Sequence, residues 1–264
     1  MKYYVIDAFA DKLFSGNPAG VCLLDAPLES ETMQKIAAEN NLAETAFVIT
    51  TAFISRKNDD FDLRWFTPAT EINLCGHATL ASAFVISNFM DKNIEEMRFN
   101  TMSGVLTVTK KDDLYEMDFP AWEVSPVEIT QLMKDSITAE ISEAHMARDL
   151  LLVLNSEEEV RNLTPDIELL RNIPGCFGVV VTAKGDTADF VSRVFAPNAG
   201  ISEDPVTGST HSELIPFWAK RLNKNKMTAK QLSKRGGTLY CEYCGERVKI
   251  AGKAVLYITG EINL

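Results

Sequence analysis

The sequence lacks the short motifs by which many cofactor-dependent enzymes can be recognised. It contains no Gly-x-Gly-x-x-Gly or Walker sequence, and its three histidines do not stand at the spacings of metal ligands. The pair Gly208-Ser209 lacks the surrounding glycines of a nucleophile elbow. These absences predict a site that works without a cofactor and without a bound metal.

Positive charge and long apolar runs are also scarce. Lys and Arg number 26 against 37 Asp and Glu, which gives a formal net charge of −11. Nucleic acids and anionic membranes need a basic surface, so neither is an expected partner. No apolar run reaches transmembrane length, and Asp7 interrupts the first apolar stretch too early for a signal peptide. We therefore expect a cytoplasmic protein.

Cysteine is odd in number and too sparse for a disulfide framework, with five in 264 residues. Cys241 and Cys244 form a lone Cys-x-x-Cys, which lacks the second pair or nearby histidine of a structural zinc site. The pair also lies in a strand-like stretch, whereas a redox pair is activated at a helix start.

What the sequence does contain is an internal repeat. Arg64–Pro68 and Arg193–Pro197 share the pattern Arg-x-Phe-x-Pro, and a glycine that opens a helix follows each copy, Gly76 or Gly208. Acidic residues stand between the motif and the glycine: Glu71 in the first copy, Glu203 and Asp204 in the second. A repeat of this long period indicates two homologous halves, and the chain has enough residues for a core in each.

The expected fold class is α+β, with two pseudo-symmetric domains over residues 1–122 and 123–264. The segment Ala78–Phe89 is apolar on every side of a helix and lies between strand-like stretches, so it must be buried. We expect each domain to wrap a mixed, curled sheet or barrel around a central helix, 77–89 in the first and 208–222 in the second. The last strand of the chain could pair with the sheet of the first domain.

Two local predictions accompany this fold. Ser15–Gly20 is dense in Gly, Asn and Pro, which is typical of a loop, either a plain turn or one that faces a substrate. Ser142–His145 is predicted as part of an acidic helical stretch, with His145 at the surface.

The segment Glu203–His211 carries the strongest indication of a site. It places an acidic pair, a proline, a glycine and three hydroxyl groups directly before an apolar helix. Gly and Ser at a helix start can bind an anion, because the free N–H groups and the positive end of the helix dipole point toward it. An ordinary capped helix is the alternative. Because Gly76 opens the first helix in the same way, the two helix starts could face one another across a cleft.

Three side chains could transfer protons near such an anion-binding site. Glu44 stands just before an apolar strand, where it is either solvated or, if the strand end faces a cleft, partly buried with a raised pKa suited to proton transfer. His77 either makes a local hydrogen bond or serves as a ligand or proton relay. Together with Asp204, these residues suit proton abstraction and return beside a carboxylate or carbonyl group.

Four segments in combination resemble the phenazine-biosynthesis PhzF family, and the likeness extends from the first strand to the last. These segments are Asn17–Gly20, Asn41–Val48, Leu74–Ala81 and Gly200–Ser209. The resemblance implies the diaminopimelate-epimerase-like fold, an active site between the two domains, no cofactor and a homodimer. It also implies an isomerase that moves a proton on a small carboxylate-bearing substrate.

Carried over by position, the resemblance implies Glu44 as the general acid/base. It implies substrate contacts for His77, Asp204 and Ser209, and backbone donors at Gly76 and Gly208. We therefore expect the catalytic residues to be Glu44, His77 and Asp204, with no metal ligand. The expected substrate-binding residues are Asn17, Cys75, Gly76, Gly208, Ser209 and Thr210.

Two alternatives remain open at this point. Related epimerases on this fold use two opposed cysteine bases, but here Thr207 stands where the partner of Cys75 would be. A one-sided epimerase or a dehydratase that uses Cys75 is one alternative. A non-catalytic protein that binds small anions is the other.

Overall fold

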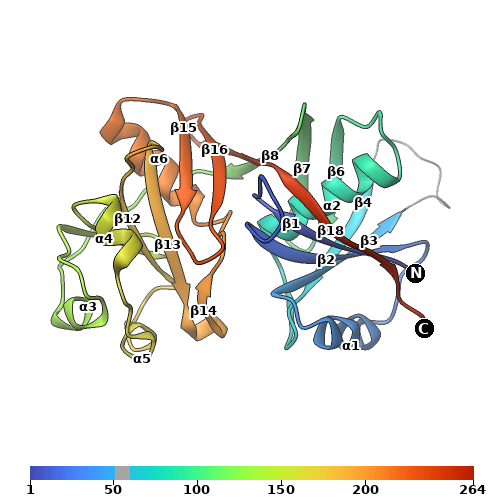
Figure 1. Cartoon of the computed structure of the whole chain (residues 1–264), viewed down its shortest axis with the longest axis horizontal. Helices are drawn as coiled ribbons and strands as arrows, with labels where there is room; N and C mark the ends of the chain where they lie inside the picture. Colours follow the sequence, from blue (N-terminus) through green and yellow to red (C-terminus); the bar gives the residue numbers. More distant parts are fainter. Residues whose placement is uncertain (51–59) are drawn as a thin grey trace. The chain divides into compact units, whose positions relative to one another are not determined.

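The computed structural model describes residues 1–50 and 60–264, which form two units that are described separately below. Unit 1 comprises Met1–Asp118 together with Ala251–Leu264, and unit 2 comprises Phe119–Ile250. The sequence analysis drew the boundary between residues 122 and 123. The chain instead enters unit 2 at Phe119, and its last segment lies with unit 1 (Figure 1).

Unit 1 is a mixed sheet with one central helix and one outer helix. Its elements are β1 Lys2–Ala8, β2 Asn17–Leu24, α1 Ser30–Asn40, β3 Glu44–Thr50, β4 Asp60–Phe66, β5 Glu71–Ile72, α2 Gly76–Phe89, β6 Glu96–Thr101, β7 Gly104–Lys111, β8 Leu114–Pro120 and β18 Ala254–Glu261. Strand β1 lies antiparallel between β2 and β18. The pairs β2–β3 and β4–β6 are parallel, while β3–β4, β4–β5, β6–β7 and β7–β8 are antiparallel.

Helix α2 is buried because it offers no polar face to water. All its residues from Gly76 to Ala83 are buried, and it packs against β1, β2 and β3 (Figure 1). Two of its buried hydroxyls bond within the helix: Thr79 Oγ1 donates to the Cys75 carbonyl at 2.6 Å, and Ser82 Oγ donates to the Ala78 carbonyl at 2.7 Å. The third, on Ser87, lies 2.8 Å from the Tyr115 hydroxyl, so each buried hydroxyl of α2 has a partner.

Strand β3 is covered on both faces. Helix α1 packs on one face through Met33, Ile36 and Ala37, and α2 contacts the strand as well. All residues of β3, from Glu44 to Thr50, are consequently buried. A carboxylate at the first position of such a strand is held at the edge of the core.

Unit 2 repeats the plan of unit 1. Its elements are β9 Ser125–Pro126, α3 Gln131–Ser136, β10 Glu143–Met146, β11 Leu150–Val153, α4 Glu157–Asn162, α5 Ile167–Arg171, β12 Val179–Lys184, β13 Phe190–Ala196, the short 3-10 helix η1 Pro197–Ala199, β14 Ile201–Asp204, α6 His211–Leu222, β15 Lys226–Gln231, β16 Gly237–Tyr243 and β17 Arg247–Gly252. The pairs β11–β12 and β13–β15 are parallel, while β10–β11, β12–β13, β13–β14 and β15–β16 are antiparallel. Unit 1 has the same sequence of pairings around α2 as unit 2 has around α6.

Helix α6 contains Pro216, and the structure compensates for the missing N–H group. A proline at this position leaves the carbonyl four residues earlier, on Ser212, without its helical donor. That carbonyl accepts a hydrogen bond from the backbone N–H of Trp122 at 2.9 Å. On another face of the helix, the ring of Trp218 stacks on Phe190 with centroids 5.9 Å apart. The helix therefore tolerates a proline in its interior.

Three local predictions were wrong. Asn17–Gly20 is not a loop but the first half of β2, because pairing with β1 and β3 on both sides overrides the turn-like composition. His145 lies in strand β10, not in a helix, and its side chain is only 12% exposed because it packs on Phe217. The predicted second central helix, 208–222, in fact begins at His211, since residues 208–210 form a turn before it.

Among the helices of residues 1–50 and 60–264, none is both long enough and apolar enough to cross a membrane.

Candidate active site

The repeated Arg-x-Phe-x-Pro motif builds the same ion pair in each unit. Arg64 binds Glu71 through Nε and Nη2, at 2.7 and 2.8 Å, and its guanidinium lies 5.2 Å from the ring centre of Phe66. In unit 2, Arg193 binds Glu203 at 2.7 and 3.0 Å and lies 5.2 Å from the Phe195 ring. Bidentate arginine–carboxylate pairs fix geometry. Each pair ties the strand before the central helix to the segment that leads into it.

In unit 1 the predicted site residues converge where three elements begin. Asn17 starts β2, Glu44 starts β3, and Cys75 is the N-cap of α2, with Gly76 and His77 in the first turn. Because β2 and β3 are parallel, their first residues lie at the same edge of the sheet. The start of α2 reaches this edge, so five residues from three distant segments form one cluster.

The cluster is connected through His77. Its Nε2 lies 3.0 Å from Oε2 of Glu44, and its Nδ1 lies 3.3 Å from Nδ2 of Asn17 and 3.5 Å from Sγ of Cys75. Glu44, Cys75 and His77 are each 6% exposed, so the group is almost wholly buried. The histidine therefore contacts all three polar neighbours at once.

Burial and the neighbouring groups set the charges in this cluster. Burial opposes the charged form of His77, but the Cys75 sulfur and the Glu44 carboxylate outweigh it and raise the pKa of the imidazole well above 6.5. Burial, reinforced by the Glu44 carboxylate, raises the pKa of the Cys75 thiol. Burial thus favours the neutral thiol of Cys75, whereas the neighbouring groups favour the charged form of His77.

In unit 2 the remaining predicted residues lie in the turn before α6. The Thr207 hydroxyl donates a short hydrogen bond to the Asp204 carboxylate, and Gly208 and Thr210 are buried while Ser209 is half-buried. Buried Gln231 secures the turn: its Oε1 accepts from the Thr207 N–H at 2.9 Å, and its Nε2 donates to the Asp204 carbonyl at 2.7 Å. The sequence analysis missed Gln231, because only the register of β15 brings it to this turn.

A second polar network at this end of unit 2 was also missed. Asp149, 1% exposed, accepts hydrogen bonds from Arg148 Nη2 at 2.5 Å and from the Thr210 hydroxyl at 3.0 Å. Its backbone N–H donates to Oε1 of Glu213 at 3.0 Å. The guanidinium of Arg148 lies between the rings of Trp122 and Phe177, at 5.1 and 5.2 Å. Asp149 precedes an apolar strand just as Glu44 does, so the same sequence signal could have found it.

Two titratable groups in the first turn of α6 are shifted toward their neutral forms. Burial, together with the Asp149 carboxylate, raises the pKa of Glu213 to about 7. Burial lowers the pKa of His211 to about 4, and its Nδ1 lies 2.8 Å from the Thr207 carbonyl. That carbonyl can only accept, so Nδ1 carries the proton of a neutral imidazole.

The repeat allows the two units to be compared position by position. Phe66 and Phe195 are the same residue of the repeated motif, and they pair with Thr45 and Val179 in the neighbouring strands. The residue of unit 2 that corresponds to Glu44 is therefore Gly178. Since Thr207 likewise replaces Cys75, the acid and the thiol of unit 1 have no counterparts in unit 2.

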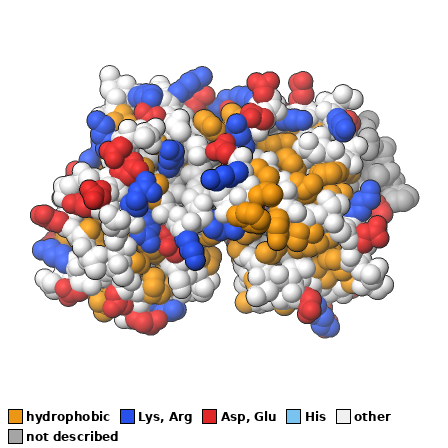
Figure 2. All heavy atoms as spheres, in the orientation of Figure 1, with side chains coloured by type: hydrophobic (Ala, Val, Ile, Leu, Met, Phe, Trp, Pro, Cys, Tyr) orange, Lys and Arg blue, Asp and Glu red, His pale blue; other side chains and the backbone are white. Residues whose placement is uncertain are grey.

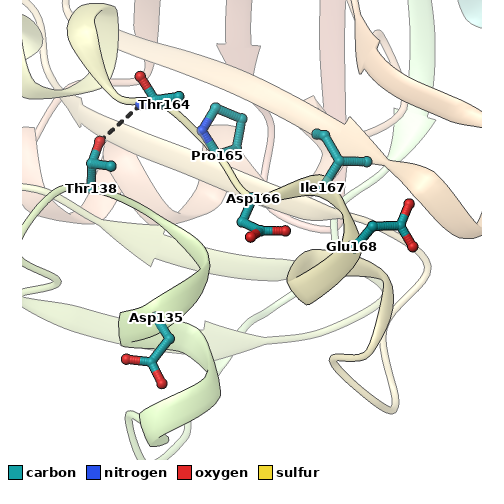
Figure 3. Close-up of a pocket in the computed structure, with 7 residues that line it drawn as sticks. All are labelled: Asp135, Thr138, Thr164, Pro165, Asp166, Ile167 and Glu168. Carbon is teal, nitrogen blue, oxygen red and sulfur yellow. Dashed lines mark hydrogen bonds between the residues drawn. The ribbon is translucent and has the colours of Figure 1, made fainter.

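The groove shown in Figure 3 lies elsewhere in unit 2 and contains none of the predicted site residues. It has a volume of about 540 Å³ and lies between α3 and the start of α5. Its carboxylates belong to Asp135, Asp166 and Glu168 and point in different directions (Figure 3). One of them, Asp166, already caps α5 by accepting from the Leu169 N–H at 3.0 Å. The groove therefore offers no convergent set of catalytic groups.

Comparison with known proteins identifies the family. A family model for phenazine biosynthesis-like proteins, PhzC-PhzF, matches residues 6–260. The chain belongs to this family. It is 46% identical over 264 residues to a Pseudomonas aeruginosa protein named as an uncharacterized isomerase, and the match covers 100% of this chain and 99% of the relative. A second such P. aeruginosa isomerase is 48% identical over 265 residues, with 100% and 99% covered. The protein is accordingly an isomerase of the PhzC-PhzF family.

Solved structures agree with the fold. A PhzF-family protein of Enterococcus faecalis superposes with a TM-score of 0.96 at 47% identity, covering 100% of this chain and 99% of that one. A probable proline racemase of Agrobacterium radiobacter shares the fold with a TM-score of 0.63 at 9% identity, with 100% and 93% covered. The predicted α+β class and the epimerase-like architecture are thereby confirmed.

Proposed function

We propose that this protein moves a proton between two positions of a small carboxylate-bearing substrate, without a cofactor, and that Glu44 is its general acid/base. In this scheme the Glu44 carboxylate takes a proton from a carbon made acidic by a neighbouring carbonyl or conjugated group. The resulting carboxylic acid exchanges its proton with water and then returns a proton at another atom of the same substrate. Atoms and charge balance within the enzyme–substrate pair, since one proton leaves and one returns.

The asymmetry between the repeated units carries this proposal. Unit 1 has a buried carboxylate at the edge of its sheet, 3.0 Å from an imidazole, whereas unit 2 has Gly178 at the matching position. A racemase that works with two opposed bases needs one base on each side of the substrate carbon. A single acid/base suits a reaction in which the proton is taken and returned by the same group.

The other predicted residues have supporting roles in the proposal. His77 Nε2, 3.0 Å from Oε2 of Glu44, holds this side chain in place for proton transfer. Asp204, Ser209 and Thr210 contact the substrate, and the N–H groups around Gly76 and Gly208 stabilise negative charge on it. These roles are the ones that the family resemblance implies. Gly76 is the first residue of α2, Asp204 ends β14, and Gly208, Ser209 and Thr210 lie in the turn before α6.

Solvent deuterium exchange tests the proposal directly. The wild-type protein is incubated in D₂O with a panel of cyclic and amino carboxylates, and NMR identifies any compound that gains deuterium at carbon. We expect exchange with at least one compound and its loss in Glu44→Gln. Exchange that survives in Glu44→Gln would show that another group moves the proton. A protein that only binds anions would show no exchange with any compound.

A dehydratase or one-sided epimerase that uses Cys75 is the second candidate. The contact of 3.5 Å between Cys75 Sγ and His77 Nδ1 favours it, because a histidine can activate a thiol. The raised pKa of the Cys75 thiol counts against it, since a thiol that stays protonated is a poor base. We therefore assign the proton transfer to Glu44.

We further propose that the protein acts as a homodimer in the cytoplasm. The family resemblance motivates the homodimer, and an exposed apolar surface on unit 1 supports it. The cytoplasmic location is the expectation drawn from the sequence. Hydrophobic side chains gather on the face of unit 1 that Figure 2 shows, and Phe14 and Tyr257, 68% and 51% exposed, have ring centres 5.8 Å apart. Exposed apolar patches often mark protein–protein contacts. Sedimentation of the full chain would measure its oligomeric state.

A further inference from the structure

The cluster in unit 1 brings together a sulfur, a nitrogen and an oxygen from three side chains. Sγ of Cys75 lies 4.0 Å from Nε2 of His77, which lies 3.0 Å from Oε2 of Glu44, and all three ligand atoms lie within 4.8 Å of one another. We propose that these three residues bind a thiophilic divalent cation of the Zn²⁺ class, and that the bound ion inhibits the enzyme. The inhibition rests on the proposed function, but the metal site does not.

The distances are close to those of a tetrahedral site. Zinc binds cysteine sulfur at about 2.3 Å and histidine nitrogen or carboxylate oxygen at about 2.0–2.2 Å, so neighbouring ligand atoms stand about 3.3–3.6 Å apart. The separation of 3.0 Å between His77 and Glu44 would widen by a few tenths of an ångström, roughly. The separation of 4.0 Å between Cys75 Sγ and His77 Nε2 would contract by a similar amount. The Cys75 sulfur and the Glu44 oxygen lie within 4.8 Å of one another and would also have to reach this range, so binding requires the three side chains to draw together.

Charge balance favours a dication at this buried position. When the ion binds, the S–H bond of Cys75 breaks, a sulfur–metal bond forms and the proton leaves to solvent. His77 releases its proton from Nε2 in the same way and coordinates as a neutral imidazole. The thiolate and the Glu44 carboxylate then cancel the two positive charges of the ion. Burying a cation whose charge is cancelled by its ligands costs much less free energy than burying an isolated cation.

The donor types also select the kind of ion. A set of thiolate, imidazole and carboxylate suits Zn²⁺ and Co²⁺, whereas Mg²⁺ and Ca²⁺ prefer oxygen ligands alone. Three protein ligands leave the fourth position for water or for a substrate carboxylate. The side-chain amide of Asn17 lies 3.3 Å from Nδ1 of His77. A side-chain amide can present its oxygen as well as its nitrogen, so Asn17 is placed to accept from Nδ1–H and orient the ring.

A metal held by these groups stops the proposed reaction for a simple reason. Glu44 cannot accept a proton from the substrate while its lone pair coordinates an ion. His77 can no longer hold Glu44 in place for proton transfer. We therefore expect Zn²⁺ to inhibit and a chelator to restore activity.

Cobalt binding tests the site without any substrate. The full chain, freed of metal with a chelator, is titrated with Co²⁺, and the near-ultraviolet absorption band that a cobalt–thiolate bond produces is recorded. We expect one equivalent of Co²⁺ to give this band in the wild type. We expect Cys75→Ser and Cys75→Ala to lose it, and Glu44→Gln and His77→Gln to bind at least about tenfold more weakly. Circular dichroism checks that each variant is folded.

Cys244→Ser is the matched control, because Cys244 is an exposed thiol and belongs to the lone Cys-x-x-Cys. This variant should keep the band. A wild type without the band would overturn the metal site, as would a band that survives in both Cys75 variants and disappears in Cys244→Ser.

Inhibition is measured separately, as loss of deuterium exchange when Zn²⁺ saturates the site. Exchange that continues under saturating Zn²⁺ would overturn the inhibition while leaving the site in place. If the metal-free protein exchanges no compound, the proposed function fails, and the cobalt spectrum still decides the metal site.

Discussion

Oε2 of Glu44 lies 3.0 Å from Nε2 of His77, although the two residues begin elements separated by two further strands of the chain. The pair is 8% and 7% exposed by side chain, so bulk water screens it little. Replacement of either partner should therefore change the chemistry of the other.

The first prediction concerns Glu44 itself. We expect Glu44→Gln to lower the rate of deuterium exchange by about 10²–10⁴-fold, because a general acid/base commonly contributes that much. Substrate binding should change little, since the amide keeps the shape of the side chain. Glu39→Gln, at an exposed glutamate of α1, is the control and should exchange at the wild-type rate.

Cys75→Ser separates the two candidate chemistries. If Glu44 moves the proton, this variant should keep exchange within about tenfold of the wild type, because Glu44 and His77 are both retained. If the protein is instead a dehydratase that uses Cys75, this variant should lose nearly all activity. The exchange rates of Cys75→Ser and Cys75→Ala are measured with the same compound as the wild type. A loss of exchange in both variants would show that the Cys75 thiol, and not Glu44, transfers the proton.

Glu213 should make the stability of the protein depend on pH in the neutral range. Its pKa is raised from 4.5 to about 7, by burial first and then by the Asp149 carboxylate. A carboxyl group whose pKa is higher in the folded chain stabilises the fold less once it ionises. Stability is therefore lost as the pH rises from about 4.5 to about 7, by up to about 3 kcal/mol.

Glu213→Gln removes this titration. The unfolding temperature of the variant should rise relative to the wild type between about pH 5 and about pH 8, as measured by calorimetry at several pH values. The exposed Glu158 gives a control variant, Glu158→Gln, whose difference from the wild type should not follow this pH dependence. A constant difference between Glu213→Gln and the wild type would mean that the buried carboxyl does not ionise in this range.

The two repeated ion pairs should differ in their importance for stability. Arg193 is 11% exposed and also donates to the carbonyls of Val160 and Leu163, at 3.3 and 2.9 Å, whereas Arg64 is 29% exposed. Loss of Arg193 leaves several buried acceptors without a donor. We expect Arg193→Met to cost about 3 kcal/mol and Arg64→Met about 1 kcal/mol, as judged from thermal unfolding. Equal costs would show that the additional carbonyl contacts contribute nothing.

Some parts of this structure could be predicted because the sequence signal is local. The helix Gly76–Phe89 is apolar on every side, so its burial follows from composition alone. The motif at Arg64 and Arg193 recurs with acidic residues after it, and this repeat predicted two homologous halves. The ion pairs of these arginines with Glu71 and Glu203 were not predicted and come from the structure.

Other parts depend on strand register, which the sequence does not display. Gln231 reaches the turn at Thr207 only because β15 lies parallel to β13. Asn17 was assigned to a loop since Gly, Asn and Pro favour turns, yet a strand paired on both sides tolerates them. In each case the strand that determines the structure comes from a distant segment of the chain. A prediction based on neighbouring residues alone therefore cannot find it.

The pairing of β1 with β18 has a consequence for how the chain is made. Strand β18 follows the whole of unit 2 in chain order, yet it supplies one of the two neighbours of β1, from Lys2 to Ala8. On the ribosome, unit 2 can therefore fold before the earlier-translated unit 1 is complete. Until β18 emerges, the nascent chain carries an unpaired strand edge, which is the kind of surface that chaperones protect and that aggregates form on.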